Sequence, residues 1–101
     1  MAFVNYKKNG GFTSGTPEVI VPALTGANET FAMTTIAVMN NDGTNDANIE
    51  IEVAGIKIIE QLISSKESYF FDINLVLVNG DDVKVTSDVA DLNIFICGIQ
   101  E

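Results

Sequence analysis

Hydrophobic and polar residues alternate along much of the chain with a period of two, which is typical of strands. The clearest case is Asn48–Val53, where isoleucine and valine alternate with asparagine and glutamate, as in a strand with one face in water. Segments rich in apolar and β-branched residues predict further strands at Thr30–Met39, Ile56–Ile59, Ser68–Asp72, Leu75–Val78, Val83–Thr86 and Leu92–Ile99. The pattern therefore predicts many short strands separated by polar segments.

Two polar segments predict how some of these strands are connected. The segment Asn40–Asp46 consists almost entirely of turn-forming residues, so we expect a hairpin with a long loop between Thr30–Met39 and Asn48–Val53. Asn79 and Gly80 predict a tight hairpin between Leu75–Val78 and Val83–Thr86, because Asn-Gly suits a turn that needs positive φ.

One segment has an alternative helical interpretation. Ile59, Leu62 and Ile63 have helical spacing within Ile56–Ser65, but the β-branched start and the lack of an N-cap favour a strand. Seven to eight strands at this spacing predict an all-β fold, an antiparallel two-sheet β-sandwich of jelly-roll or immunoglobulin-like type. The strand order stays open.

The first sixteen residues differ in composition from the rest. Residues 1–16 combine apolar side chains with two lysines and several glycines, and we interpret them as an N-terminal arm joined to a β-sandwich domain at 17–101. Such an arm would bind a neighbouring subunit, through Phe3, Tyr6, Lys7, Lys8 and Phe12. The alternative is that residues 2–6 form the first strand of the sandwich.

Composition narrows the function classes. Apolar residues make up 47% of the chain and charged residues 19%, which predicts a folded domain. The net charge of -9 argues against nucleic acid as a partner, and the longest apolar runs are too short to span a membrane. No secretory signal pattern is visible, so we expect synthesis in the cytoplasm.

Catalytic chemistry has little support in the sequence. The chain contains no histidine, which excludes Ser-His and Cys-His nucleophiles, and the single Cys97 is expected in the core of an apolar strand. Glu50 and Glu52 are explained by a solvent-facing strand. We therefore expect no enzyme activity, no catalytic residues and no cofactor. The oxygen-rich loop Asn40–Asp46 leaves calcium binding open, although it lacks the EF-hand spacing.

Several segments resemble small tailed-bacteriophage virion proteins. They are Val19–Pro22, Thr35–Gly43, Ala47–Ile51, Leu75–Thr86 and Asp91–Ile96. The resemblance covers residues 17–101 and consists mainly of strand and turn patterns, whereas the segment Lys7–Gly15 departs from it. It implies a virion structural protein without catalytic residues, such as a subunit that decorates or cements a capsid.

The leading hypothesis is therefore a capsid decoration or cement subunit that binds the major capsid protein and forms a homo-oligomer in the virion. A tail, neck or fibre adaptor subunit of a virion is one alternative. A carbohydrate- or calcium-dependent binding module that uses the loops at one end of the sandwich is another.

Overall fold

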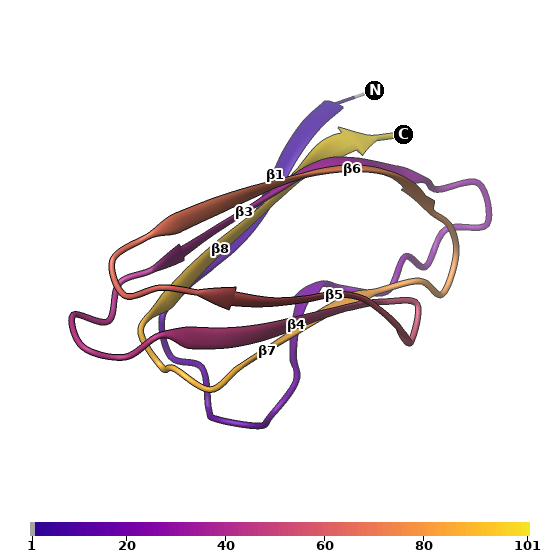
Figure 1. Ribbon diagram of the computed structural model, residues 1–101. Helices are drawn as coiled ribbons and strands as arrows, with labels where there is room; N and C mark the ends of the chain where they lie inside the picture. Colours follow the sequence, from indigo (N-terminus) through magenta and orange to yellow (C-terminus); the bar gives the residue numbers. More distant parts are fainter. Residues whose placement is uncertain (1) are drawn as a thin grey trace.

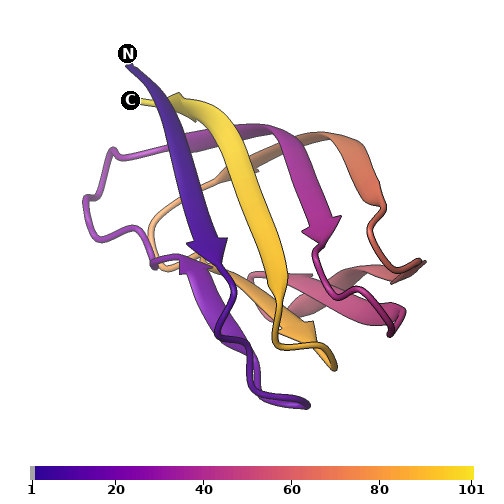
Figure 2. The same ribbon diagram turned by 90° about the vertical axis from the view of Figure 1, so that its left-hand side faces the viewer.

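The computed structural model describes residues 2–101, which form two four-stranded antiparallel sheets stacked face to face (Figures 1 and 2). In chain order the strands are β1 (Ala2–Asn9), β2 (Glu18–Val21), β3 (Phe31–Asn40), β4 (Ala47–Val53), β5 (Ile56–Ile63), β6 (Ser68–Leu77), β7 (Val83–Ser87) and β8 (Leu92–Gln100). Residues 2–101 include no helix that could cross a membrane. The predicted all-β sandwich is confirmed.

The strand order identifies the type of sandwich. One sheet has the order β1-β8-β3-β6 and the other β2-β7-β4-β5. The chain thus pairs as one long antiparallel ribbon, with β4 on β5 at its tip, followed by β3 on β6, β2 on β7 and β1 on β8. Folding this ribbon over brings β8 beside β3 and β7 beside β4. This is the jelly-roll topology.

Neither of the two hairpins predicted from the sequence forms, because the strands on either side of each turn lie in different sheets. The segment 40–46 leads from β3 in one sheet to β4 in the other, and Asn79-Gly80 leads from β6 to β7, which also lie in different sheets. Gly80 does adopt a positive φ of 90°, and the backbone N–H of Asp81 donates to the carbonyl of Val78 at 3.0 Å, so a turn forms here. Asn79 does not share the positive φ, so this is not the hairpin turn that the sequence predicted. A turn fixes only the local chain direction, and here the next strand pairs with a distant partner.

The only two consecutive strands of the described chain that pair are β4 and β5. Ala54 and Gly55 join them with φ values of 52° and 80°. Positive φ at both central positions of a two-residue loop is the geometry of a type I′ hairpin.

Two strands have different bounds in the structure from those predicted from the sequence. Strand β5 continues to Ile63, so the helical alternative for 56–65 does not occur. Ser68–Asp72 and Leu75–Leu77 are parts of one strand, β6, which continues through Ile73 and Asn74 beside an irregularity in β3 between Met33 and Thr35, whereas Val78 lies outside the strand.

The core lies between the two sheets and consists of every second residue of the strands. Its largest fully buried side chains are Phe31, Met33, Ile36, Ile49, Ile51, Ile63, Leu77, Leu92, Ile94 and Ile96. Inward positions alternate with outward ones in each strand, as the period of two requires. The core therefore leaves two outer faces, one for each sheet.

The N-terminal segment belongs to the sandwich. Residues 2–9 pair with β8 over their whole length, and the Phe12 backbone N–H continues the pairing to the carbonyl of Ala90. Of the two interpretations of residues 1–16, the structure agrees with the one in which the segment forms the first strand of the sandwich. Met1 lies outside the described residues. Strand β1 is an edge strand, so its outward side chains border one outer face.

Candidate functional site

The outer face of the β1-β8-β3-β6 sheet is largely apolar, and we call it the apolar face. Strand register places its side chains in rows that cross all four strands. One row is Phe3, Ile99, Ala32 and Val76, and another is Lys7, Phe95, Ala37 and Phe70. Between them lies the row Asn5, Cys97, Thr35 and Asp72, and Asn9, Asn93, Met39 and Ser68 follow at one end.

Large side chains of the apolar face are open to solvent. Phe3 is 87% exposed, Phe70 72% and Val76 61%. Such residues scattered singly are normal, but aromatic and aliphatic side chains gathered over one sheet indicate an interaction surface. Burial of each of these side chains against a partner would contribute about 1.5–3 kcal/mol.

The apolar face also contains a shallow depression. It has a volume of about 140 Å³ and lies over the paired strands β6, β3 and β8, where Ala37 separates Phe70 from Phe95 and Met39 and Ser68 close one end. Because alanine stands between two phenylalanines in one row, the surface is ridged. A partner with a complementary ridge would fill the depression.

Charge is nearly absent from the apolar face. Of the residues that form the four rows described above, Lys7 and Asp72 carry a charge. They have opposite sign and lie on the two edge strands, β1 and β6. This face is thus neutral in a chain whose net charge is -9.

The outer face of the other sheet is polar. Its rows include Glu50, Glu52, Lys57, Glu60 and Lys84 on β4, β5 and β7. The difference between the two faces shows that the apolar character of the first is specific to one side of the molecule.

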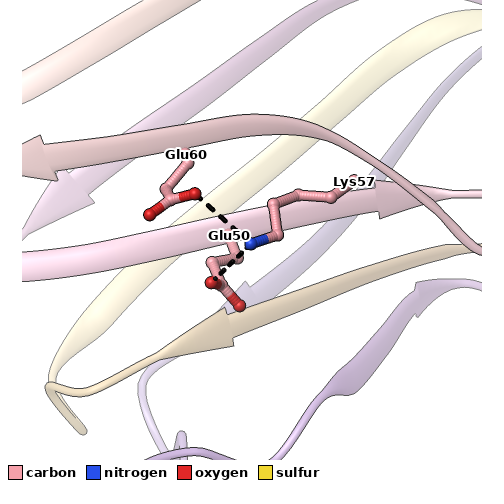
Figure 3. A network of polar contacts seen from close by, with 3 residues as sticks. All are labelled: Glu50, Lys57 and Glu60. Carbon is pink, nitrogen blue, oxygen red and sulfur yellow. Dashed lines mark hydrogen bonds and ion pairs between the residues drawn. The ribbon is translucent and has the colours of Figure 1, made fainter.

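Lys57 joins two of these acidic residues, as Figure 3 shows. Its Nζ donates hydrogen bonds to Oε1 of Glu50 at 3.0 Å and to Oε2 of Glu60 at 3.3 Å. The hydrogen bond to Glu50, followed by that to Glu60, raises the pKa of Lys57. All three side chains are solvent-exposed, so the cluster adds little stability and acts as a solvated surface. The two carboxylates and the lysine thus form one exposed ion-pair cluster.

The loop 41–46, which the sequence left open as a calcium site, uses its polar groups internally. Oδ1 of Asp42 accepts hydrogen bonds from the backbone N–H groups of Thr44 and Asn45, both at 2.8 Å. These two bonds, that of Asn45 first, lower the pKa of Asp42. Asp46 Oδ1 accepts from the backbone N–H of Ser65 at 3.0 Å.

A buried asparagine anchors this loop to β5. Asn40 Nδ2 donates to the backbone carbonyls of Asn45 and Ile63, and Asn40 Oδ1 accepts from the N–H of Asp42. A polar depression of about 440 Å³ lies nearby, lined by Asp42, Asn45, Asp46, Asp88, Val89 and Ala90. Within residues 2–101, no three acidic or cysteine side chains converge as metal ligands. The side chains of Asn40, Asp42 and Asp46 therefore stabilise the conformation of the loop.

The five residues expected to bind a partner do not share one surface. Phe3 and Lys7 lie on the apolar face. Phe12 is buried in the core, Tyr6 packs edge-on against Phe31 with ring centroids 5.3 Å apart, and the Nζ of Lys8 lies 5.4 Å from the ring centroid of Phe12. Partner binding therefore stays a prediction that rests on Phe3 and Lys7, with Phe70, Phe95 and Val76 added by the structure.

Cys97 does not lie in the core. It is half-buried on the apolar face, because Ile94 and Ile96 occupy the inward positions of β8. The alternation within β8 already contained this signal, since residue 97 has the opposite parity to the inward isoleucines.

Comparison with known proteins supports the fold. No protein-family model and no curated protein sequence matches the chain. A solved structure of Tobacco streak virus coat protein is similar with a TM-score of 0.52 and 11% identity, covering 96% of this chain and 84% of that one. A structure from a study of Bacillus endospore appendages, described as disulfide-linked pili, has a TM-score of 0.51 and 14% identity, covering 98% and 83%.

A weaker similarity exists to a carbohydrate-binding module. The CBM36-1 domain of a multidomain xylanase from the hindgut metagenome of Trinervitermes trinervoides has a TM-score of 0.45 and 12% identity, covering 98% of this chain and 95% of that one. The coat protein and the endospore appendage structure, at 11% and 14% identity, show a shared fold. The chain is a jelly-roll β-sandwich, a class used for structural and binding roles.

Proposed function

We propose that the chain is a structural subunit of a virion, in particular a capsid decoration subunit of a tailed phage that binds the major capsid protein. The observation that carries the proposal is the apolar face, a neutral and exposed surface on a strongly acidic protein. Such a surface is suited to permanent association with protein, because its burial removes apolar area from water.

Two further observations agree with this role. The segments quoted above resemble phage virion proteins, and the acidic remainder of the surface keeps the subunit away from packaged nucleic acid. Glu50 and Glu60 on the polar face pair with Lys57, and Asp42 and Asp46 in the loop 41–46 accept backbone hydrogen bonds, which gives these four carboxylates structural partners.

The test is binding to particles. Capsids of the virus that encodes the chain, prepared without it, are mixed with purified protein and sedimented. Saturable co-sedimentation and new density on the capsid shell in cryo-electron microscopy would support the proposal. Density only at the tail, neck or fibres would favour the adaptor alternative, and no association with any part of the particle would refute both.

Matched variants connect the particle binding to the apolar face. Phe70→Ser removes an aromatic side chain that is 72% exposed on this face, and Ile56→Ser removes a side chain that is 66% exposed on β5 of the other sheet. We expect the first to weaken co-sedimentation and the second to leave it unchanged. Circular dichroism checks that both variants fold.

A further inference from the structure

We propose that the apolar face binds a second copy of this chain, face to face, around a two-fold axis that runs along the strands. This inference rests on the proposed assembly role of the face and names its partner. The subunit would then attach to the particle as a dimer. A variant of the apolar face that separates the two copies would also weaken particle binding, because each copy would then have to bind alone.

Charge favours a second copy as the occupant. Two chains of net charge -9 repel each other over most of their surface. The apolar face escapes this repulsion, because its rows carry one lysine and one aspartate. Association through this face alone brings two copies together without stacking like charges.

The positions of these two residues select the direction of the axis. Lys7 is on edge strand β1 and Asp72 is on the opposite edge strand β6, in neighbouring rows about 7 Å apart along the strands. A two-fold axis along the strands places β1 of one copy over β6 of the other, which brings each Lys7 toward the Asp72 of the second copy. An axis across the strands would instead place β1 over β1 and β6 over β6, so that lysine approaches lysine and aspartate approaches aspartate.

The same axis also matches large side chains with small ones. Because β8 and β3 are the two central strands, β8 of one copy lies over β3 of the other. Phe95 then faces Ala37 of the second copy, and Ile99 faces Ala32. On the edges Phe3 faces Val76, and the stem of Lys7 lies over Phe70. On the two central strands each of these large side chains thus meets an alanine, which suits two sheets packed about 10 Å apart.

The area of the face reaches the lower limit for a specific contact. Four strands about 4.8 Å apart, over roughly eight residues at about 3.3 Å each, present about 500 Å² per copy. Two copies would bury about 1,000 Å², which reaches the size at which specific protein interfaces begin.

The test measures the mass of the full chain in solution, with no capsid present. Sedimentation velocity should show a dimer of about twice the 10.9 kDa chain mass. Lys7→Glu and Asp72→Lys should each raise the dimer dissociation constant by about tenfold or more, because each places like charges together at two symmetric sites. The double variant Lys7→Glu/Asp72→Lys restores opposite charges and should recover most of the affinity.

The geometry provides matched controls. Lys7 and Asp72 are three strands apart within one copy, roughly 14 Å, so their direct interaction inside a monomer is weak. Lys84→Glu changes the net charge as Lys7→Glu does, but on the polar face, and should leave the dimer intact. Phe70→Ser should also weaken the dimer without unfolding the chain, whereas Ile56→Ser should not.

Each outcome separates this inference from the proposed function. A chain that stays monomeric at high concentration, or a dimer unaffected by both the charge swap and Phe70→Ser, overturns the inference. A monomer that still needs Phe70 to bind capsids refutes the second copy but supports the proposed function, with the capsid protein as the occupant. A dimer that responds as expected but binds no particle supports the inference and refutes the proposed function.

Discussion

Gly98 is the position where the structure predicts the largest effect of adding one methyl group. A Cβ built on Gly98 would lie 2.4 Å from the backbone oxygen of Ala32 and 2.7 Å from Cε1 of Phe31. Ala32 belongs to β3, which is hydrogen-bonded to β8 along this stretch, and Phe31 is completely buried beneath Tyr6. Neither neighbour can move without disturbing the sheet or the core.

The size of the effect follows from the distance. Ordinary van der Waals contact begins at 3.4 Å, so the Ala32 oxygen would have to retreat by about 1 Å from its 2.4 Å position. Overpacking of a core costs about 1–3 kcal/mol, and we expect Gly98→Ala to reach the upper end because a backbone atom must shift. A loss of about 3 kcal/mol lowers the melting temperature of a domain of this size by roughly 12–24 °C.

The assay is thermal and urea unfolding followed by circular dichroism, with Gly43→Ala as the control. A Cβ on Gly43 would meet only the flexible end of Lys66 at 3.7 Å, so this variant should melt close to the unmodified chain. If Gly98→Ala melted within a few degrees of that control, the close approach of β3 and β8 at Gly98 would be refuted.

Four further outcomes are expected. Deletion of residues 1–16 should unfold or aggregate the protein, because β8 loses the strand paired with it and the core loses Phe12; a soluble truncated chain with a full strand signal in circular dichroism would contradict this. Ala54→Asn should raise stability by about 0.5–1 kcal/mol, since asparagine tolerates the φ of 52° at this turn better than alanine, and a lower urea midpoint would refute the turn geometry. Because its pKa is lowered in the fold, Asp42 should stabilise the protein at neutral pH and lose this contribution as pH falls through the acid range; Asp42→Asn should therefore flatten the pH dependence of urea unfolding in that range. Millimolar calcium should leave the melting temperature unchanged, because the carboxylates of the loop 41–46 accept backbone hydrogen bonds; a large rise would show a ligand site there.

Local patterns predicted most of the strands but not how they pair. The alternation in Asn48–Val53 predicted both the strand and the outward position of its glutamates, because burial on one face imposes a period of two. Asn79-Gly80 predicted the turn but not its role, since the sequence around a turn does not say which sheet the next strand joins. The pairing of β1 with β8 joins residues nearly a whole chain apart, and no local pattern encodes it.

The sequence contained only an ambiguous sign of the apolar face. Ile94–Cys97 is a continuous apolar run, which is usual for a strand covered on both sides. The sequence interpretation placed Cys97 in the core, whereas the structure buries Ile94 and Ile96 and leaves Phe95 and Cys97 on the outer side of the sheet. Phe3 and Phe70 could not be placed on one surface until the order β1-β8-β3-β6 was known.

The nested pairing of the strands has a consequence for synthesis on the ribosome. Strand β8 lies between β1 and β3, so the first and third strands remain without this neighbour until residues 92–100 have left the exit tunnel. Only the tip formed by β4 and β5 can close early, since its two strands are joined by two residues. Sheets built from such distant segments form slowly. A ribosome that stalls before residue 92 would hold a chain with its apolar strands open, exposed to aggregation and to proteases.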